Sequence, residues 1–402
     1  MIYLYYLLSA LLVYYSIRSF IGGSRYLEYF RAELSRPRIT TLPFATVFAP
    51  CKGLDDGLRE NLERLFVQDY PNYEIVFVVE DASDPAVAVI EDLRSSSDLK
   101  TMLVIASRAI HSSQKCRNLR DAVPRADKAS EIFVFVDSDA RPSNKWLASL
   151  AAPLDDPAIG ASTGYRWFIA EPTSFAGELR SMWNASVASS LGPNTSSNFC
   201  WGGSTAIRRE TFESLKIDNA WDTSLSDDYT VTRAMRSAGL SITFVPQALT
   251  PSIESCTFRE LLEFTTRQMK ITRIYARHLW LQSFLGSGLF IVVMAMSVAV
   301  LLTTENALPF WWAACSLILI SAASVGKSTL RLRAVRLVSA DLKAKTRRQY
   351  LWHGFLWCLS PVLFFMNCFA ALLSRSVTWR RIRYEMVSPS ETIVIDRPGR
   401  TS

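Results

Sequence analysis

The fold of this chain is decided by the stretch Ile132-Phe133-Val134-Phe135-Val136-Asp137-Ser138-Asp139-Ala140. An apolar run of this length without strict alternation predicts a strand buried on both faces. In open α/β sheets, ligands bind beyond the carboxyl ends of such strands. Asp137 and Asp139 are therefore expected in a crevice, where both can serve one hard divalent cation, Mg²⁺ or Mn²⁺, that carries a nucleotide diphosphate. The alternative is a solvated acidic turn.

Strand and helix patterns alternate before this stretch. Apolar, β-forming runs predict three earlier strands, at 44–50, 73–79 and 102–106. Apolar residues at helical spacing predict helices between them, at 58–68, 87–93 and 114–122. This alternation predicts a parallel sheet with crossover helices, a Rossmann-like α/β domain. The later pattern is looser, with a strand near 160–168, a helix at 175–191 that lies against a bilayer or in a core, and a last strand at 240–246.

The apolar residues, 49% of the 402, gather in four blocks. Residues 1–21 are aromatic and apolar without a cleavage site, which favours an uncleaved transmembrane anchor over a signal peptide. Three more blocks lie within 281–373, each long enough to cross a hydrocarbon core of about 30 Å as a helix. In chain order, the predicted domains are the anchor 1–21, a soluble α/β domain 22–255, an amphipathic interface helix 256–280, three transmembrane or re-entrant segments 281–373 and a tail 374–402.

Basic residues set the expected orientation. Arginines follow the anchor at positions 18, 25, 31, 36 and 38, so the positive-inside rule places the soluble domain in the cytoplasm. The basic loop 326–350 agrees with this. The tail does not, because three complete later spans would put it outside, although it is rich in arginine. A last segment that spans and one that re-enters, interrupted at Pro361, both remain open.

The chain has a net charge of +7, with its basic residues concentrated beside the apolar blocks. This distribution suits anionic lipid headgroups better than nucleic acid. Acidic residues, by contrast, mark the ends of predicted elements: Glu80, Asp81 and Asp84, then Asp137 and Asp139, then Asp227 and Asp228. Acids that follow successive parallel strands line one crevice. Taken alone, Asp227 and Asp228 read equally well as an ordinary helix N-terminus, and Lys52 and Lys115 as solvated side chains.

From Pro50 to Trp280 the chain resembles the inverting nucleotide-sugar glycosyltransferases of the A-type (GT-A) fold, and within them the ceramide glucosyltransferase branch with its bacterial relatives that glycosylate lipids. The motifs that carry the resemblance are Pro50-Cys-Lys-Gly53, Glu80-Asp-Ala-Ser-Asp-Pro85, Ser113-Gln-Lys115 with Asn118, Asp137-Ser-Asp139, Trp201-Gly-Gly-Ser204, Ser226-Asp-Asp-Tyr229 and Arg267-Gln268 through Arg273. One anchor before the domain and several spans after it match the same layout.

The resemblance implies a role for each acid. Asp81 or Asp84 contacts the uracil of a UDP-sugar donor. Asp137 and Asp139 hold the ribose and the metal on the diphosphate. Asp228 is the general base on the acceptor hydroxyl, with Asp227 beside it where relatives often have Glu. An inverting transfer needs one such base and a charge sink for the leaving diphosphate, and no covalent nucleophile.

The resemblance also implies that cationic or polar side chains contact the donor phosphates, with Arg267, Gln268 and Arg273 as candidates; Lys52 and Lys115 lie in matching motifs. The family pattern is Gln or Arg, two residues, then Arg-Trp, whereas this chain has Lys270 and Ile271 in the Arg-Trp places. Without the acids upstream, this basic stretch would be interpreted as snorkelling at lipid headgroups. The missing Trp argues against a polymer-making enzyme.

The sequence therefore predicts an integral protein of a bacterial inner membrane, with a cytoplasmic domain that moves a hexose from a UDP-sugar to a lipid hydroxyl. The acceptor is ceramide or a related lipid. The alternatives are a polysaccharide synthase and a non-catalytic membrane scaffold built on a transferase fold.

Overall fold

The computed structural model describes residues 2–36 and 42–397 and divides the chain into two compact units. Arg38 and residues 398–402 of the tail lie outside the described residues. The helical unit consists of Met1–Leu34, Thr173–Ser189 and Cys256–Ser374. The sheet unit consists of Ser35–Pro172, Ser190–Ser255 and Arg375–Ser402. The predicted α/β domain is therefore interrupted by one helix that belongs to the other unit.

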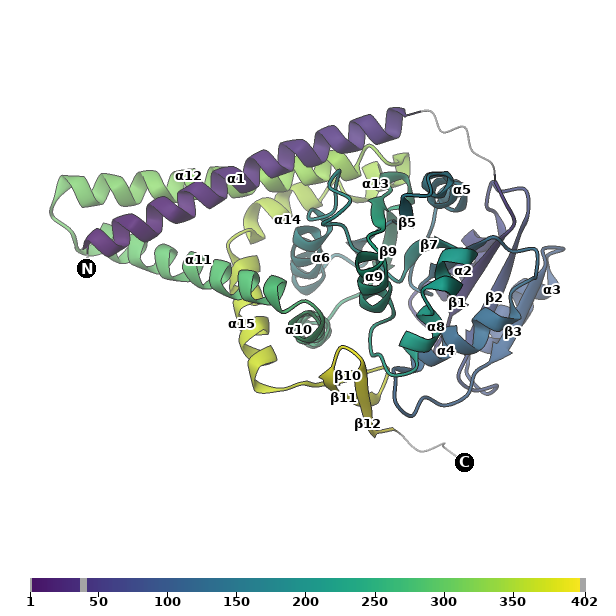
Figure 1. The fold of residues 1–402 in the computed structure, drawn as a ribbon. Coiled ribbons are helices and arrows are strands. Elements are labelled where there is room, and N and C mark those ends of the chain that lie inside the picture. The colour runs from purple at the N-terminus through teal and green to yellow at the C-terminus, as the bar shows by residue number, and fades with distance from the viewer. Residues whose placement is uncertain (1, 37–41, 398–402) are drawn as a thin grey trace. The chain divides into compact units, whose positions relative to one another are not determined.

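The sheet unit is built on seven strands in the order β3-β2-β1-β4-β7-β5-β8 (Figure 1). Their bounds are β1 Ala45–Pro50, β2 Tyr73–Val79, β3 Thr101–Ile105, β4 Ile132–Val136, β5 Ile159–Thr163, β7 Ser204–Arg208 and β8 Ser241–Phe244. The four strands predicted first, β3 to β4 along the sheet, pair in parallel, and β4 is buried at every position. The predicted α/β fold class is thus confirmed.

Strand β7 runs antiparallel to both its neighbours, β4 and β5, and was not predicted. It is only five residues long and follows Gly202-Gly203, a pair that indicates a turn. The strand expected near 160–168 is two strands, because the chain breaks at Gly164. A Cβ there would lie 2.0 Å from the carbonyl oxygen of Ala248, so only glycine permits this approach. The second piece, β6 (Arg166–Ala170), pairs with β9 (Thr250–Glu254) in a separate sheet.

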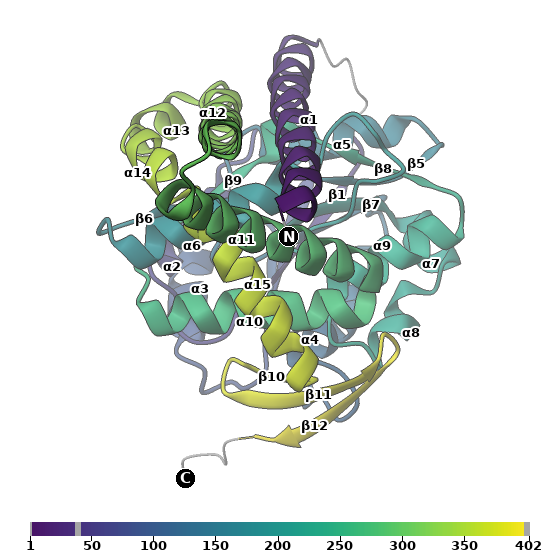
Figure 2. The same cartoon turned by 90° about the vertical axis from the view of Figure 1, so that its left-hand side faces the viewer.

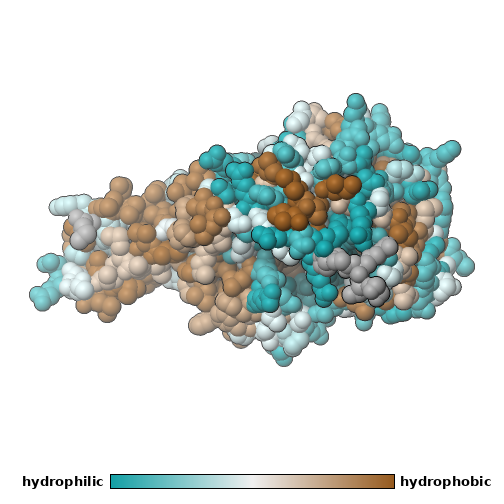
Figure 3. All heavy atoms as spheres, turned by 90° about the horizontal axis from the view of Figure 1, so that it is seen from below, coloured by the Kyte–Doolittle hydropathy of each residue, from teal (hydrophilic) through white to brown (hydrophobic). Residues whose placement is uncertain are grey.

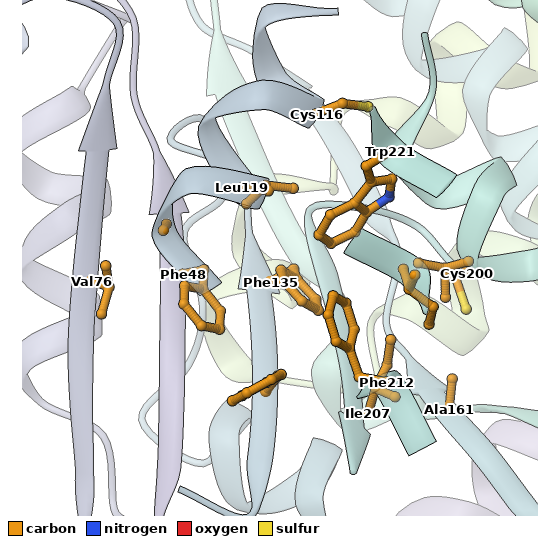
Figure 4. Packing of buried hydrophobic residues seen from close by; sticks show 14 of the residues in the cluster. Phe48, Val76, Cys116, Leu119, Phe135, Ala161, Cys200, Ile207, Phe212 and Trp221 are labelled. Atoms are coloured by element: carbon orange, nitrogen blue, oxygen red, sulfur yellow. The ribbon is translucent and has the colours of Figure 1, made fainter. Parts of the chain in front are cut away.

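Helices cover the sheet between its strands. Their bounds are α2 Leu58–Phe66, α3 Ala86–Ser95, α4 Gln114–Ala122, α5 Trp146–Ala151, α7 Arg209–Ser214, α8 Ile217–Trp221 and α9 Asp227–Ser237. Figure 4 shows the core on one face, where aromatic rings from the strands meet Phe212 and Trp221. The Trp221 ring lies edge-on to Phe135, with ring centroids 5.4 Å apart. This contact fixes α8 at the carboxyl end of β4.

The helical unit carries the apolar blocks. Its helices are α1 Ile2–Ser35, α6 Phe175–Ala188, α10 Phe258–Tyr275, α11 Arg277–Thr303, α12 Ala307–Val335, α13 Ala340–Lys345, α14 Gln349–Leu356 and α15 Leu359–Leu373 (Figure 2). Among the described residues, α1, α11 and α12 are long and apolar enough to cross a membrane, and α14 with α15 forms a pair bent by 63° that would make a fourth. Figure 3 shows hydrophobic side chains over these helices, at the left of the view.

The structure changes the end of one predicted helix and decides the placement of another. The first helix continues to Ser35 instead of ending at residue 21, because it passes through Gly22-Gly23, a pair that indicates a turn, without a break. The helix expected at 175–191 is α6, and eleven of its residues are buried, so the core alternative is correct. Its Leu179 and Trp183 pack with Leu261 of α10 and Leu363 of α15.

The tail is a folded part of the sheet unit. It forms three antiparallel strands, β10 Ser376–Trp379, β11 Ile382–Ser388 and β12 Glu391–Asp396. Val377, Ile382, Tyr384 and Met386 are buried. The tail therefore packs against the same unit as the strands that carry the acids.

Candidate active site

The two acids after β4 face the same cation. Arg166, the first residue of β6, places one guanidinium nitrogen 2.9 Å from Asp137 Oδ2 and the other 3.0 Å from Asp139 Oδ2. The guanidinium stacks over the Trp201 ring, 4.7 Å from its centroid. Although the two carboxylates alternate along the chain, the turn after β4 brings them to one point in space. The expectation that Asp137 and Asp139 can serve one cation is consistent with this geometry.

A second cation links the two acidic motifs. Lys115 is the second residue of α4, whose N-cap Ser113 accepts a hydrogen bond from the Cys116 amide. Its ammonium lies 2.7 Å from Asp137 and 3.0 Å from Asp227 Oδ2. Its side chain is 14% exposed. Lys115 is thus a buried ion-pair partner and not the solvated side chain of the alternative interpretation.

Asp227 and Asp228 begin α9 and have different surroundings. Asp227 is 4% exposed and lies behind Lys115, whereas Asp228 is half-buried. Ser226 is the N-cap, and its hydroxyl also donates to Asp228 Oδ1. The Tyr229 amide donates to the same oxygen at 2.7 Å. The second oxygen, Oδ2, lies 3.5 Å from the Gly202 amide nitrogen. One carboxylate oxygen of Asp228 is therefore held in place while the other faces Gly202.

The core positions this helix. The Trp221 indole, packed on Phe135, donates to the Asp227 carbonyl oxygen at 3.1 Å. A small cavity lined by Gly202, Asp227 and Asp228 lies beside it, together with Phe135, Cys200, Thr205, Trp221 and Val231. Lys115 joins Asp137 to Asp227, so the acids after β4 and those at the start of α9 form one cluster of the sheet unit. This cluster and the small cavity beside Asp227 and Asp228 are together called the crevice.

Glycines permit this packing. A Cβ on Gly202 would lie 2.1 Å from Asp227 Oδ2 and 2.8 Å from Lys115 Nζ. A Cβ on Gly203 would lie 2.7 Å from Asp137 Oδ2 and even closer to the Trp201 ring. The backbone at Gly202-Gly203 therefore forms a turn and also lies close to the acids, where a side chain would not fit.

Burial and the ion pairs shift the pKa values of the three acids Asp137, Asp139 and Asp227 in different directions. Burial alone would raise the pKa of Asp137, but Lys115 and Arg166 outweigh it and lower that pKa. Burial raises the pKa of Asp139 by more than Arg166 lowers it. Burial also raises the pKa of Asp227, to about 6, although Lys115 opposes the shift. The crevice thus contains more buried negative charge than its own cations neutralise.

The acids after β2 hold a loop together. Both oxygens of Asp84 accept from the Gly53 amide, at 2.9 and 3.1 Å, and one also accepts from the Ala86 amide. Asp81 accepts from the amide and hydroxyl of Ser83. Lys52 pairs with Glu80 at 2.6 Å and remains 30% exposed. Both acids therefore accept hydrogen bonds within this loop, Asp84 from two backbone amides and Asp81 from Ser83.

The basic stretch lies on α10 of the helical unit. The Arg273 guanidinium donates to the Ala371 carbonyl oxygen at 2.5 Å and lies 5.8 Å from the Trp280 ring centroid. Arg267 lies over the Phe264 ring at 5.6 Å. The backbone carbonyl oxygen of Gln268 accepts a hydrogen bond from the Thr272 hydroxyl. A role for these three residues at the diphosphate remains a prediction.

Sequence reasoning missed three members of the network: Arg166, Asp55 and Arg380. Asp55 accepts a 2.7 Å hydrogen bond from the Ser138 hydroxyl and pairs with Arg380 of the tail. Arg166 carries no local signal, because it follows a break at Gly164 that the pattern did not reveal.

Comparisons with known proteins give the site a context. The chain is 28% identical over 110 residues to a ceramide glucosyltransferase of Candida albicans, which is 26% of this chain and 20% of the relative. It is 30% identical over 90 residues to a ceramide glucosyltransferase of Komagataella phaffii, 22% of this chain and 16% of the relative. The matched part thus spans about a fifth or less of these curated relatives.

A structure of a mannosyltransferase from Pyrobaculum calidifontis, in complex with GDP-Man and Mn²⁺, aligns with 91% of this chain and 98% of its own, at 20% identity and a TM-score of 0.48. The family assignment rests on a broader match. The model of Glycosyl transferase family 21 matches residues 6–391, nearly the whole chain, and covers both acidic motifs, the apolar blocks and most of the tail. The chain therefore belongs to glycosyl transferase family 21.

Proposed function

We propose that this protein transfers a hexose from a UDP-sugar to the hydroxyl of a membrane lipid, ceramide or a related lipid, with inversion at the sugar carbon. The observation that carries the proposal is the ion-pair bridge of Lys115, which joins Asp137 after β4 to Asp227 at the start of α9 and so brings the two acidic motifs together. Inverting transfer needs a base and a charge sink close together. The crevice contains groups of both kinds.

Asp228 is the proposed general base. Hydrogen bonds from Ser226 and Tyr229 fix one of its oxygens, which leaves the other to accept the proton of the acceptor hydroxyl. The resulting oxygen attacks the sugar carbon, whose bond to the diphosphate breaks, and the diphosphate leaves with the electron pair. Asp227, buried against Lys115, holds that cation in place and takes no proton from the acceptor.

The donor diphosphate is proposed to bind at Asp137 and Asp139, which fit a divalent metal. Both carboxylates already converge on the single guanidinium of Arg166. Among the described residues no cluster of three or more metal-ligating side chains exists, so the remaining ligands would come from phosphate oxygens and water. A bound Mg²⁺ or Mn²⁺ would neutralise charge on the leaving diphosphate.

The nucleoside and phosphate contacts complete the donor site. We assign the uracil to the loop after β2, through Asp81 or Asp84. Lys52, which is 30% exposed and paired with Glu80, is proposed as a phosphate ligand. Arg267, Gln268 and Arg273 of α10 are proposed as cationic and polar ligands of the donor phosphates.

The helical unit is proposed to present the lipid. Three helices in the described residues are long and apolar enough to span a bilayer. The basic residues in the second half of α1 and from Lys327 of α12 to residue 350 support a cytoplasmic sheet unit, which we place at a bacterial inner membrane. Uridine nucleotide sugars are then supplied from the same side as the crevice.

The test is Asp228→Asn in the full chain. Removal of a general base lowers rate by about 10²–10⁴-fold, so transfer should fall by that factor while UDP binding, measured by calorimetry, stays within about threefold because the variant keeps every donor contact. Products are followed by mass spectrometry of lipids from cells with and without the protein. Full activity in the variant would remove Asp228 as the base. A long polymer in place of a glycolipid would indicate a polysaccharide synthase, and absence of both transfer and UDP binding a scaffold.

A further inference from the structure

The C-terminal sheet carries an arginine to the acidic crevice. Strands β10 and β11 are joined by the two-residue turn Arg380-Arg381, with φ of 51° and 65°. Turns of this kind require positive φ at both positions and strongly favour Asn-Gly. Two arginines in the left-handed region are unusual, and such backbone outliers gather at functional sites. The turn is therefore a candidate functional element.

Arg380 reaches the acids through one carboxylate. Its guanidinium pairs with Asp55, whose side chain is 13% exposed. The other oxygen of Asp55 accepts from the hydroxyl of Ser138 at 2.7 Å. Ser138 is the residue between Asp137 and Asp139. A continuous chain of polar contacts thus runs from the tail to the centre of the acidic motif.

The rest of the tail is fastened around the same crevice. The buried hydroxyl of Tyr384 accepts from the backbone amide of Gln114, which precedes Lys115 on α4. Arg397 pairs with Glu80, the partner of Lys52, and donates to Gln114 Oε1 at 3.0 Å. These contacts hold the C-terminal sheet next to the residues that precede or pair with Lys115 and Lys52.

Arg380 also interacts electrostatically with the carboxylates of the acidic motif. Burial lowers the pKa of its guanidinium, and the carboxylates of Asp55, Asp139 and Asp137 together raise it by more. Its side chain nevertheless remains 42% exposed, whereas that of Arg166 is only 12% exposed. Arg380 is thus a cation that lies within the field of the acids and is still open to a ligand.

We propose that Arg380 binds the terminal phosphate of the donor nucleoside diphosphate, so that the C-terminal hairpin forms part of the donor site. This inference rests on the proposed function in that the donor is a nucleotide diphosphate sugar. A guanidinium binds phosphate oxygens through charge-assisted hydrogen bonds, and its fork matches their geometry. The competing account is that Arg380 only fastens the hairpin through Asp55.

The experiment measures binding of UDP and UMP to the full-length protein in detergent with Mn²⁺, by calorimetry. Arg380→Gly removes the cation and relieves the positive φ, so the hairpin keeps its turn. Arg381→Gly makes the same backbone change at the exposed neighbour and is the matched control. Arg380→Gly should weaken UDP binding by about tenfold or more, the loss of one charge-assisted hydrogen bond. UMP binding should change much less, and Arg380→Lys should recover part of the affinity.

Unchanged UDP affinity in Arg380→Gly overturns the inference. Equal losses for UDP and UMP, or equal losses in both glycine variants, also overturn it, because they indicate a distorted hairpin. If the wild-type chain does not bind UDP, the proposed donor is wrong instead. The same variants are then compared with GDP and ADP against their monophosphates, which still tests Arg380.

Discussion

The ammonium of Lys115 lies 2.7 Å from Oδ1 of Asp137, and both side chains are largely buried. The same ammonium is 3.0 Å from Asp227. One cation thus joins the acid at the end of β4 to the acid at the start of α9. The donor and acceptor halves of the proposed reaction share this residue, which makes it the most informative position to change.

We expect Lys115→Met to abolish transfer and to destabilise the sheet unit. Methionine keeps the length of the side chain but leaves Asp227 without its cation and Asp137 with Arg166 alone, and breaking a buried ion pair costs about 3–5 kcal/mol. Thermal unfolding and transfer activity are the measurements. Lys128→Met, on the exposed loop before β4, is the control and should change neither by much. A stable Lys115→Met protein with normal activity would contradict the assigned role.

We expect Gly202→Ala to impair transfer strongly. The new Cβ would lie 2.1 Å from Asp227 Oδ2, so the carboxylate and Lys115 must move. A displacement of about 1 Å in a catalytic site costs about 10²-fold in rate. Gly192→Ala is the matched control, since a Cβ there meets no atom within 4 Å. Equal activity of the two variants would show that Asp227 tolerates displacement.

The strands β1 to β4 and the convergence of the acids were predictable because each rests on a local pattern. Five apolar residues before Asp137 suffice to predict a buried strand, and strand ends determine where the acids emerge. What was missed depends on tertiary structure. Arg166 reaches the acids from β6, which exists because Gly164 lets the chain pass the Ala248 carbonyl.

The tail shows the same limit. Its strands alternate buried and exposed residues, as at Ile382, Tyr384 and Met386. The arginines beside them had been interpreted only through the positive-inside rule, and the turn Arg380-Arg381 lacks the Asn-Gly signal of a hairpin. Its contact with Asp55 spans more than three hundred residues of sequence, and no local pattern encodes it.

We expect Asp227 to make transfer activity depend on pH. Burial raises its pKa to about 6, with Lys115 opposing the shift. As pH falls through about 6, Asp227 takes up a proton and loses its charge pair with Lys115. We expect transfer activity to fall over this range. Asp227→Asn keeps a hydrogen-bond acceptor for Lys115 and mimics the protonated state, so its activity should be lower at neutral pH and flatter between pH 5 and 7.

The contribution of Asp227 to folding stability should increase as pH falls, whereas transfer activity should decrease. The unfolded pKa of Asp is about 3.9, so between about pH 4 and about 6 the folded state binds more protons than the unfolded state. The stability that Asp227 contributes is fully present below about pH 4 and is lost as pH rises through about 6. Thermal unfolding of Asp227→Asn against the wild type measures this difference. An unchanged activity profile in the variant would assign the titration to another group.

The tail and the acid-bearing strands belong to one compact unit, and this restricts how the last apolar block meets the membrane. Helices α11 and α12 bring the chain back to its starting side if both span. A third complete span by α14 and α15 would then place the tail on the opposite side from β1 to β9. We therefore expect the pair, bent by 63°, to re-enter without crossing.

The measurement is labelling with a membrane-impermeant maleimide in intact cells. Cys315 and Cys358 are first changed to Ser, because the other native cysteines are buried. Glu305→Cys, between α11 and α12, should react from outside, whereas Arg381→Cys should react only after the membrane is broken. Labelling of both reporters from outside would mean that the last pair spans, and the tail could not then lie beside Asp55. The orientation of one arginine hairpin thus decides between the two topologies left open by the charge pattern.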